Sequence, residues 1–294
     1  MKKFDLQGTG VALVTPFHKQ GNIDFTAFGN LIEHTISGGV DYLLCLGTTS
    51  EYPTLSKQEK MAIVEYTIEK VENRVPIVLG MGGNDTRSLV DEIRKTDFSS
   101  IAAILSVAPY YNKPNQKGLY THFKAVAEAS DVPVILYNVP GRCGVNISAE
   151  TCVQLATDFP NIIGIKEASG NISQCMDILM NKPQGFIVVS GEDALVLPLM
   201  VLGMQGVISV TANAFPKQMS ELVNHCLKSN MKKARAVHEK LLPFSKAIFE
   251  EGNPVGIKAA LEIMNIASSN LRQPLVKASK PLQTKLQTII NNIN

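Results

Sequence analysis

The stretch Ile162-Ile163-Gly164-Ile165-Lys166-Glu167 is a short apolar run that ends in a lysine. It is the sixth of eight such runs, rich in valine, isoleucine and leucine, which alternate with segments of helical length. Near-continuous apolar runs are typical of parallel strands that are covered on both faces. The predicted strands are 10–15, 42–46, 75–80, 102–107, 133–137, 162–166, 187–190 and 207–210.

Helical segments are predicted between these strands at 25–37, 57–72, 88–97 and 116–130, with Asp24 as the N-cap of the first. An open doubly wound sheet is the rival arrangement. Eight regular units without a Gly-x-Gly-x-x-Gly turn after the first strand favour closure instead. The sequence therefore predicts an α/β fold of the (β/α)8 TIM-barrel class.

The strand pattern stops after Phe215, and the remaining chain predicts helices at 216–230, 231–251, 254–266 and 281–293. The first of these completes the barrel, and the others form a C-terminal helical extension. A barrel needs roughly 250 residues, so a chain of 294 residues accommodates both parts. We expect a catalytic barrel domain at 1–230 and a helical extension at 231–294.

The composition is 45% hydrophobic and 18% charged, with a formal net charge of +2 from scattered lysines and arginines. This pattern lacks the basic cluster expected of a partner of nucleic acid or anionic membranes. The N-terminus has no apolar signal segment, and no apolar run is long enough to cross a membrane. Five cysteines without a C-x-x-C pair indicate reduced thiols, with Cys143 the best reactive candidate. We expect a cytoplasmic protein.

Lys166 is the first candidate for chemistry, because the active site of such a barrel lies at the C-terminal ends of its strands. Strand alternation places Lys166 on the same face as Ile162 and Gly164, and we expect Gly164 to leave room beneath the amine. An apolar surrounding lowers a lysine pKa and yields the free amine that forms a Schiff base with a ketone. The alternative is a salt bridge to Glu167, although adjacent strand residues point to opposite faces.

Other polar residues follow neighbouring strands. Tyr137 is either a proton shuttle beside Lys166 or a core tyrosine. The turn containing Thr48 and Thr49 either holds a carboxylate with its amides and hydroxyls or is a plain turn. Arg142 is either a clamp for a second carboxylate or a solvated loop arginine.

Two methionine pairs with helical spacing, Met176 with Met180 and Met200 with Met204, are predicted to lie in the core. The histidines stand at unrelated spacing, so we assign no metal site. No organic cofactor is required either, because a protonated lysine imine is itself an electron sink.

Six motifs follow one another across the predicted barrel. They are Gly47-Thr48-Thr49-Ser50-Glu51, Pro109-Tyr110-Tyr111-Asn112, Tyr137-Asn138-Val139-Pro140-Gly141-Arg142, Gly164-Ile165-Lys166-Glu167-Ala168, Ser190-Gly191-Glu192-Asp193 and Gly206-Val207-Ile208-Ser209. Taken together they resemble the dihydrodipicolinate synthase family, the pyruvate-binding, lysine-dependent branch of the class I aldolase-like barrels. The resemblance covers nearly the whole chain, and the order of the motifs is more specific than any one of them.

The resemblance implies that Lys166 forms an imine with pyruvate, which becomes an enamine and attacks the aldehyde of L-aspartate 4-semialdehyde. The product implied is 4-hydroxy-tetrahydrodipicolinate, in the diaminopimelate and lysine biosynthesis pathway. Tyr137 then resembles the proton donor and acceptor, with Thr48 and Tyr111 completing a hydroxyl relay.

The same resemblance implies three substrate contacts. Thr49 corresponds to a ligand of the pyruvate carboxylate, Arg142 to the anchor of the semialdehyde carboxylate, and the Ile208 backbone to the pocket wall. The tyrosine matching Tyr111 reaches into a neighbouring subunit in this family, which implies a dimer, and pairs of dimers give a homotetramer.

N-acetylneuraminate lyase and other 2-oxo-acid aldolases share the barrel and the lysine, so the second substrate is the open question. Arg142, two residues after the proline of Tyr-Asn-x-Pro, favours the synthases. Ser50 stands where the family usually has glycine, and we expect a modest backbone adjustment there. A non-catalytic pyruvate sensor is the remaining alternative, because a fold does not fix a function.

Feedback inhibition by lysine is a separate question. Lysine-sensitive members of the family place a histidine and a glutamate where this chain has Lys60 and Ser88. A cation and a neutral hydroxyl are poor partners for the ammonium group of lysine. The resemblance therefore implies weak inhibition or none.

Overall fold

Eight parallel strands form one closed barrel in the order β1 to β8 in a computed structural model that describes residues 4–293. This confirms the predicted fold class. The strands are β1 Gly8–Ala12, β2 Tyr42–Cys45, β3 Ile77–Gly80, β4 Ala103–Val107, β5 Val134–Asn138, β6 Ile162–Glu167, β7 Ile187–Ser190 and β8 Gly206–Ser209. Only the first differs from its predicted bounds by more than two residues.

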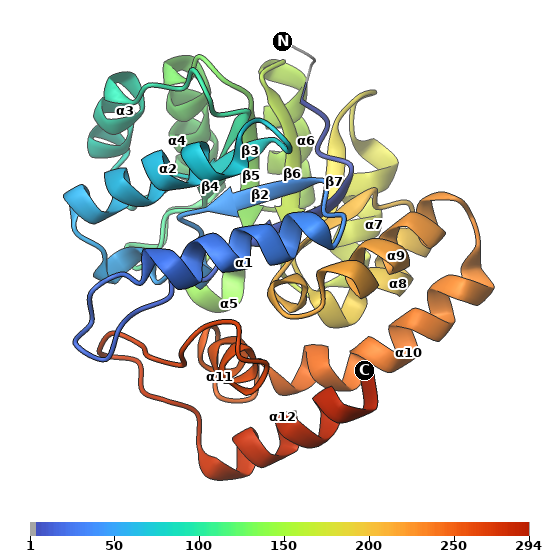
Figure 1. The fold of residues 1–294 in the computed structure, drawn as a ribbon. Helices are drawn as coiled ribbons and strands as arrows, with labels where there is room; N and C mark the ends of the chain where they lie inside the picture. The colour runs from blue at the N-terminus through green and yellow to red at the C-terminus, as the bar shows by residue number, and fades with distance from the viewer. Residues whose placement is uncertain (1–3, 294) are drawn as a thin grey trace. The chain divides into compact units, whose positions relative to one another are not determined.

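Helices follow the strands in the expected alternation (Figure 1). Asp24 accepts a hydrogen bond from the backbone nitrogen of Ala27 at 2.9 Å and is the predicted N-cap of the first helix. The helices beside the strands are α1 Phe25–Ser37, α2 Lys57–Val71, α3 Thr86–Lys95, α4 Gln116–Ala129, α5 Pro140–Cys143, α6 Ala149–Asp158, α7 Ile172–Asn181 and α8 Val196–Val201. The C-terminal helices are α9 Pro216–Leu227, α10 Met231–Ala247, α11 Val255–Ile263 and α12 Lys280–Ile293.

The chain packs as two compact units. The first contains the residues up to Gln7 together with Pro76–Ile208, and so includes β3 to β7 and α3 to α8. Its strands pair in parallel, and its helices α3 and α4 lie side by side (Figure 1).

The second unit contains Gly8–Val75 and the chain from Ser209 onward. Strands β1 and β2 pair within it, α9 packs on α10, and α12 packs on both α10 and α11 (Figure 1). The C-terminal helices therefore belong to the same unit as the first two strands. The division into domains at residues 230 and 231 stays a prediction.

A register shift interrupts the pairing of β5 with β6. Val134 pairs with Ile162 and Ile135 pairs with Gly164, which leaves Ile163 as the extra residue of a bulge. A Cβ on Gly164 would lie 2.6 Å from Cδ2 of Leu6 and 2.4 Å from the carbonyl oxygen of Ile187. The N-terminal Leu6 thus fills the space at Gly164, and the expectation that this glycine makes room for the amine of Lys166 is wrong.

All five cysteines are buried, and none forms a disulfide within the described part of the chain. Burial raises the pKa of Cys143 to about 11 and that of Cys45 to about 12, so the thiolate is disfavoured at both. Cys143 is therefore not an activated nucleophile. From Phe4 to Ile293, no helix is long and apolar enough to span a membrane.

The two predicted methionine pairs differ. Met200 and Met204 are 7% and 2% exposed and lie in the core, as expected. Met176 and Met180 are 39% and 82% exposed, so the prediction for this pair is wrong. Helical spacing alone does not say which face of a helix is covered, and on α7 the methionines lie on the uncovered face.

Candidate active site

Lys166 lies one residue before the end of β6 and is 5% exposed. Its register partners are Tyr137 on β5 and Val189 on β7. Side chains at matched positions of neighbouring strands share a face, and the Nζ of Lys166 lies 4.6 Å from the centre of the Tyr137 ring. The structure therefore brings these two predicted site residues together.

Burial lowers the pKa of Lys166 to about 8. The carboxylates of Asp193 and Glu192 oppose this shift because they stabilise the ammonium form, whereas the charge of Arg142 adds to it. Desolvation is the largest of these effects. With this pKa, about a tenth of the amine is unprotonated at pH 7, against well under a thousandth for an ordinary lysine.

The salt bridge between Lys166 and Glu167 is absent from the described residues. Glu167 instead accepts hydrogen bonds from Asn138 at 2.9 Å, from Gln174 at 3.0 Å and from the backbone nitrogen of Ser169 at 2.7 Å. These neutral donors satisfy the buried carboxylate of Glu167. Within the described residues, that carboxylate therefore forms no ion pair with the amine of Lys166. The face on which Lys166 lies is thus separate from the network around Glu167.

Asn138, which donates to Glu167, also holds the segment that carries Arg142. The side-chain oxygen of Asn138 accepts from the backbone nitrogen of Ile147 at 2.9 Å, and its amide nitrogen donates to Asn146 at 2.8 Å. Arg142 itself is exposed on the short helix α5, with no ion pair to any residue from 4 to 293. A guanidinium held by its backbone and open to solvent is suited to binding a carboxylate.

Tyr111 is 89% exposed and has a φ of 72°. This left-handed conformation is uncommon for a residue other than glycine. Asn112 anchors the loop by donating to the carbonyl oxygen of Asn84 at 2.9 Å. The Tyr111 ring is therefore presented to solvent and is not packed beside Lys166. Ile208, in β8, is fully buried.

Thr48 and Thr49 lie in the second unit, in a short 3-10 helix that follows β2. Thr49 is 2% exposed, and Thr48 is half-buried. Ser50 fits this turn well, because its hydroxyl donates to the carbonyl oxygen of Gly47 at 2.6 Å. The positive φ of the turn, 59°, falls on Glu51 and not on Ser50. The serine thus closes the turn without requiring the backbone conformation for which glycine is favoured.

Sequence reasoning assigned no role to three residues beyond β7. A Cβ on Gly191 would lie 3.0 Å from Cε of Lys166, so this glycine is the one that gives the lysine room. Asp193 is 3% exposed, and burial raises the pKa of Glu192. The motif Ser190-Gly191-Glu192-Asp193 at the end of a predicted strand could have drawn attention to these residues. The sequence alone does not show, however, that the two acids raise the pKa of Lys166.

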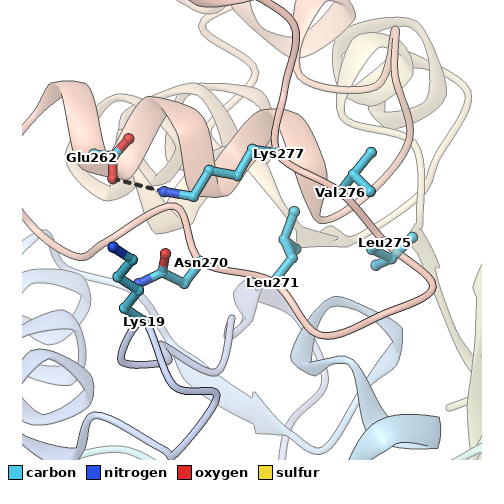
Figure 2. A pocket seen from close by; sticks show the side chains of 7 residues that line it. All are labelled: Lys19, Glu262, Asn270, Leu271, Leu275, Val276 and Lys277. Carbon is cyan, nitrogen blue, oxygen red and sulfur yellow. Dashed lines mark ion pairs between the residues drawn. The ribbon is translucent and has the colours of Figure 1, made fainter.

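A pocket of about 460 Å³ lies elsewhere, in the second unit (Figure 2). Figure 2 shows Lys277 and Glu262 pointing toward one another, and their charged atoms are 3.7 Å apart. The pocket is lined by Lys19, Glu262, Asn270, Leu271, Leu275, Val276 and Lys277. None of the predicted site residues lines it, so it is distinct from the surroundings of Lys166.

Comparisons with known proteins find relatives that match along nearly the whole chain. The 4-hydroxy-tetrahydrodipicolinate synthase of Parabacteroides distasonis is 46% identical over 294 residues, which cover 100% of this chain and 99% of the relative. The enzyme of the same name from Bacillus subtilis is 39% identical over 96% of this chain and 97% of its own. The crystal structure of dihydrodipicolinate synthase from Thermotoga maritima matches with a TM-score of 0.95 at 39% identity, covering 98% of each chain. The model of the dihydrodipicolinate synthetase family matches residues 5–293, and this chain is a member of that family.

Proposed function

We propose that this protein is a 4-hydroxy-tetrahydrodipicolinate synthase, a lyase that condenses pyruvate with L-aspartate 4-semialdehyde in diaminopimelate and lysine biosynthesis. The observation that carries the proposal is the buried amine of Lys166, with a pKa of about 8, beside the ring of Tyr137. The family membership and the names of the relatives support the choice of substrates.

The reaction follows from the free amine. Lys166 attacks the ketone carbon of pyruvate, water leaves, and a protonated imine forms. Loss of a methyl proton gives an enamine whose carbon attacks the semialdehyde carbonyl, forming the new carbon–carbon bond. The amine of the semialdehyde then attacks the imine carbon, which closes the ring and releases Lys166. The net reaction joins the two substrates and releases one water.

Tyr137 is proposed to donate and accept protons during imine formation, because its ring lies beside the reacting nitrogen. Thr48 and Tyr111 are proposed to complete the relay. Thr49 is proposed to bind the pyruvate carboxylate, with the backbone of Ile208 in the pocket wall. The free guanidinium of Arg142 is proposed to bind the carboxylate of the semialdehyde.

The direct test is turnover of pyruvate with L-aspartate 4-semialdehyde, coupled to a downstream reductase, beside a cleavage assay with N-acetylneuraminate. Turnover in the first assay alone supports the synthase. Cleavage in the second supports a sugar-acid aldolase and removes the role given to Arg142. Silence in both, with pyruvate still bound, supports a sensor.

Borohydride reduction in the presence of pyruvate tests the imine separately. The wild type is expected to gain the mass of a reduced pyruvate adduct on the peptide that contains Lys166. Lys166→Arg keeps the charge but cannot form the adduct at neutral pH, since its guanidinium stays protonated. An adduct on another lysine would contradict the assignment.

We also propose a cytoplasmic homotetramer built from dimers. Two features support association: Tyr111 is 89% exposed, and Ile172, Met176 and Met180 form an exposed apolar stripe at i, i+4 spacing on α7. One solved relative is described as a monomeric variant, so the solution mass has to be measured, and analytical ultracentrifugation gives it. The division into a barrel at 1–230 and an extension at 231–294 is kept as part of this proposal.

A further inference from the structure

Asn253 lies between α10 and α11, close to a turn that precedes it by about two hundred residues. Its side-chain nitrogen donates to Oγ1 of Thr49 at 3.0 Å. Thr49 is 2% exposed and Asn253 is 9% exposed, so both partners of this hydrogen bond are buried. The bond therefore forms largely out of competition with water.

Because Asn253 is the donor in this hydrogen bond, the hydrogen of the Thr49 hydroxyl must point away from Asn253. An amide nitrogen donates and does not accept, so Oγ1 of Thr49 is the acceptor, and its own hydrogen points elsewhere. Between residues 4 and 293, no hydrogen bond takes that hydrogen. Thr49 is thus held as a donor that has no acceptor among the residues that the structure describes.

The other end of the Asn253 amide argues against a purely structural role. Its Oδ1 is buried and has no hydrogen-bond partner within the described residues. An unpaired buried carbonyl costs stability, and a leucine of similar size would avoid that cost. What the asparagine supplies is therefore its donor to Thr49.

The same C-terminal segment fixes the backbone of the turn. Lys258 donates to Oε1 of Glu51 and, at 2.9 Å, to the carbonyl oxygen of Asn270. The backbone nitrogen of Arg272 donates to the other carboxylate oxygen of Glu51 at 2.9 Å. Two groups from this segment thus hold the residue with positive φ, while Asn253 sets the hydroxyl two residues before it.

We propose that Asn253 is a positioning residue that orients the hydroxyl of Thr49 as a hydrogen-bond donor to the carboxylate of the 2-oxo-acid substrate. This rests on the proposed function, and specifically on Thr49 as the ligand of that carboxylate. Asn253 does not touch the substrate and acts through Thr49 alone. Its loss should therefore affect binding of pyruvate and leave the semialdehyde unaffected.

The first variants are Asn253→Leu and Asn253→Asp. Asn253→Leu frees the hydroxyl to rotate and is expected to raise the KM for pyruvate about tenfold, the loss of one hydrogen bond to a charged group. Asn253→Asp is expected to raise it further, because its carboxylate accepts the Thr49 hydrogen and repels the substrate carboxylate. The KM for the semialdehyde and kcat should stay within about twofold of the wild type.

A double-mutant cycle with Thr49→Val separates positioning from general damage. Thr49→Val already lacks the hydroxyl, so adding Asn253→Leu is expected to have no further effect on the KM for pyruvate. Thermal unfolding of Asn253→Leu is expected close to the wild-type midpoint, because removal of the unpaired carbonyl offsets loss of the hydrogen bond to Thr49. Additive effects with Thr49→Val, or equal losses for both substrates, would overturn the proposal.

Borohydride trapping at graded pyruvate concentrations gives the same comparison without the second substrate. A wild type that traps pyruvate but does not turn over the semialdehyde defeats the proposed synthase and leaves the role of Asn253 standing. If the wild type turns over normally and Asn253→Leu traps pyruvate with unchanged half-saturation, the positioning role of Asn253 is defeated and the proposed synthase stands. The two failures are therefore distinguishable.

Discussion

The amine of Lys258 donates to Oε1 of Glu51 with both side chains only 1% exposed. A buried charge left without its partner typically costs about 3–5 kcal/mol. Lys258→Met is therefore expected to lower the free energy of unfolding by about that amount, measured by urea titration. Adding Glu51→Gln should recover most of the loss, since no charge then remains. A double variant no more stable than Lys258→Met would contradict the pairing.

The protonation state of Lys166 determines how the rate of imine formation depends on pH. Only the unprotonated amine attacks a ketone, and the pKa of Lys166 is lowered by burial to about 8. The rate of borohydride-trapped imine formation is expected to rise about tenfold per pH unit below 8 and to level off above it. A midpoint near 10 would mean that the amine is not desolvated in solution.

Asp193 and Glu192, which follow β7, should influence the midpoint of the pH profile of imine formation. Asp193 is the larger of the two carboxylate influences that raise the pKa of Lys166, ahead of Glu192. Asp193→Asn removes a charge that stabilises the ammonium, so the midpoint is expected at lower pH. Glu192→Gln is the matched control and should produce a smaller shift in the same direction. A shift to higher pH would refute the electrostatic account.

Two glycines give a paired prediction. Gly191→Ala places a methyl 3.0 Å from Cε of Lys166 and 2.5 Å from Cβ of Ala168, and is expected to lower kcat more than tenfold by displacing the amine. Gly164→Ala places it 2.4 Å from a backbone carbonyl oxygen and is expected to cost about 1–3 kcal/mol in stability instead. Activity per folded molecule, with thermal unfolding alongside, distinguishes the two. Equal activity losses at both positions would contradict the assignment of Gly191 to the lysine.

Glu59 links stability to acid pH. A hydrogen bond from Arg272 is the main cause that lowers the pKa of Glu59 to about 2, from an ordinary value of 4.5. The stabilisation is therefore present above about 4.5 and is lost as the pH falls from there toward 2. Glu59→Gln is expected to cost about 1 kcal/mol at pH 7, allowing for solvent screening.

That cost should largely disappear near pH 2, where about half of the wild-type carboxyl is also protonated. Urea titrations at several pH values measure the difference. Glu33→Gln is the control, because the pair of Glu33 with Arg74 is more exposed and should contribute less. A Glu59→Gln effect that is constant with pH would exclude the ion pair as its cause.

Inhibition by lysine is expected to be weak. The Nζ of Lys60 lies 3.4 Å from the centre of the Tyr52 ring, and the hydroxyl of Ser88 donates to Asp85 at 2.5 Å. Neither residue offers a free carboxylate to an ammonium group. Steady-state rates should be essentially unchanged at micromolar L-lysine. Strong inhibition in that range would show that other residues form an effector site.

The fold was largely predictable, because each strand is a local apolar run and closure follows from eight repeats of one pattern. The sequence also predicted Lys166 and Tyr137 as candidates for the same reason, since each lies at the end of its own run; the structure places them side by side, and their catalytic roles stay a prediction. The space beside the lysine was assigned to the wrong glycine. Alternation counted along β6 cannot detect that Leu6 fills the space at Gly164 or that Gly191 lies beside Lys166, because both residues come from other segments of the chain.

Contacts between residues far apart in the sequence also could not be predicted. Asn253 and Lys258 reach residues 204 and 207 positions earlier in the chain, and no local pattern marks either as a partner of the turn after β2. On α7, the exposed face of Met176 and Met180 could not be distinguished from a buried one. In each case the missing information is which surfaces meet, and that is a property of the packed molecule.

The five buried thiols make the wild-type chain a ready background for site-specific chemistry. Their raised pKa values and lack of exposure keep them out of reach of maleimide reagents near neutral pH. A single substitution at an exposed position outside the apolar stripe of α7, such as Arg235→Cys, would then carry a fluorophore or spin label without prior removal of native cysteines. Distances measured between labels on different copies of this chain would report directly on whether and how the copies associate.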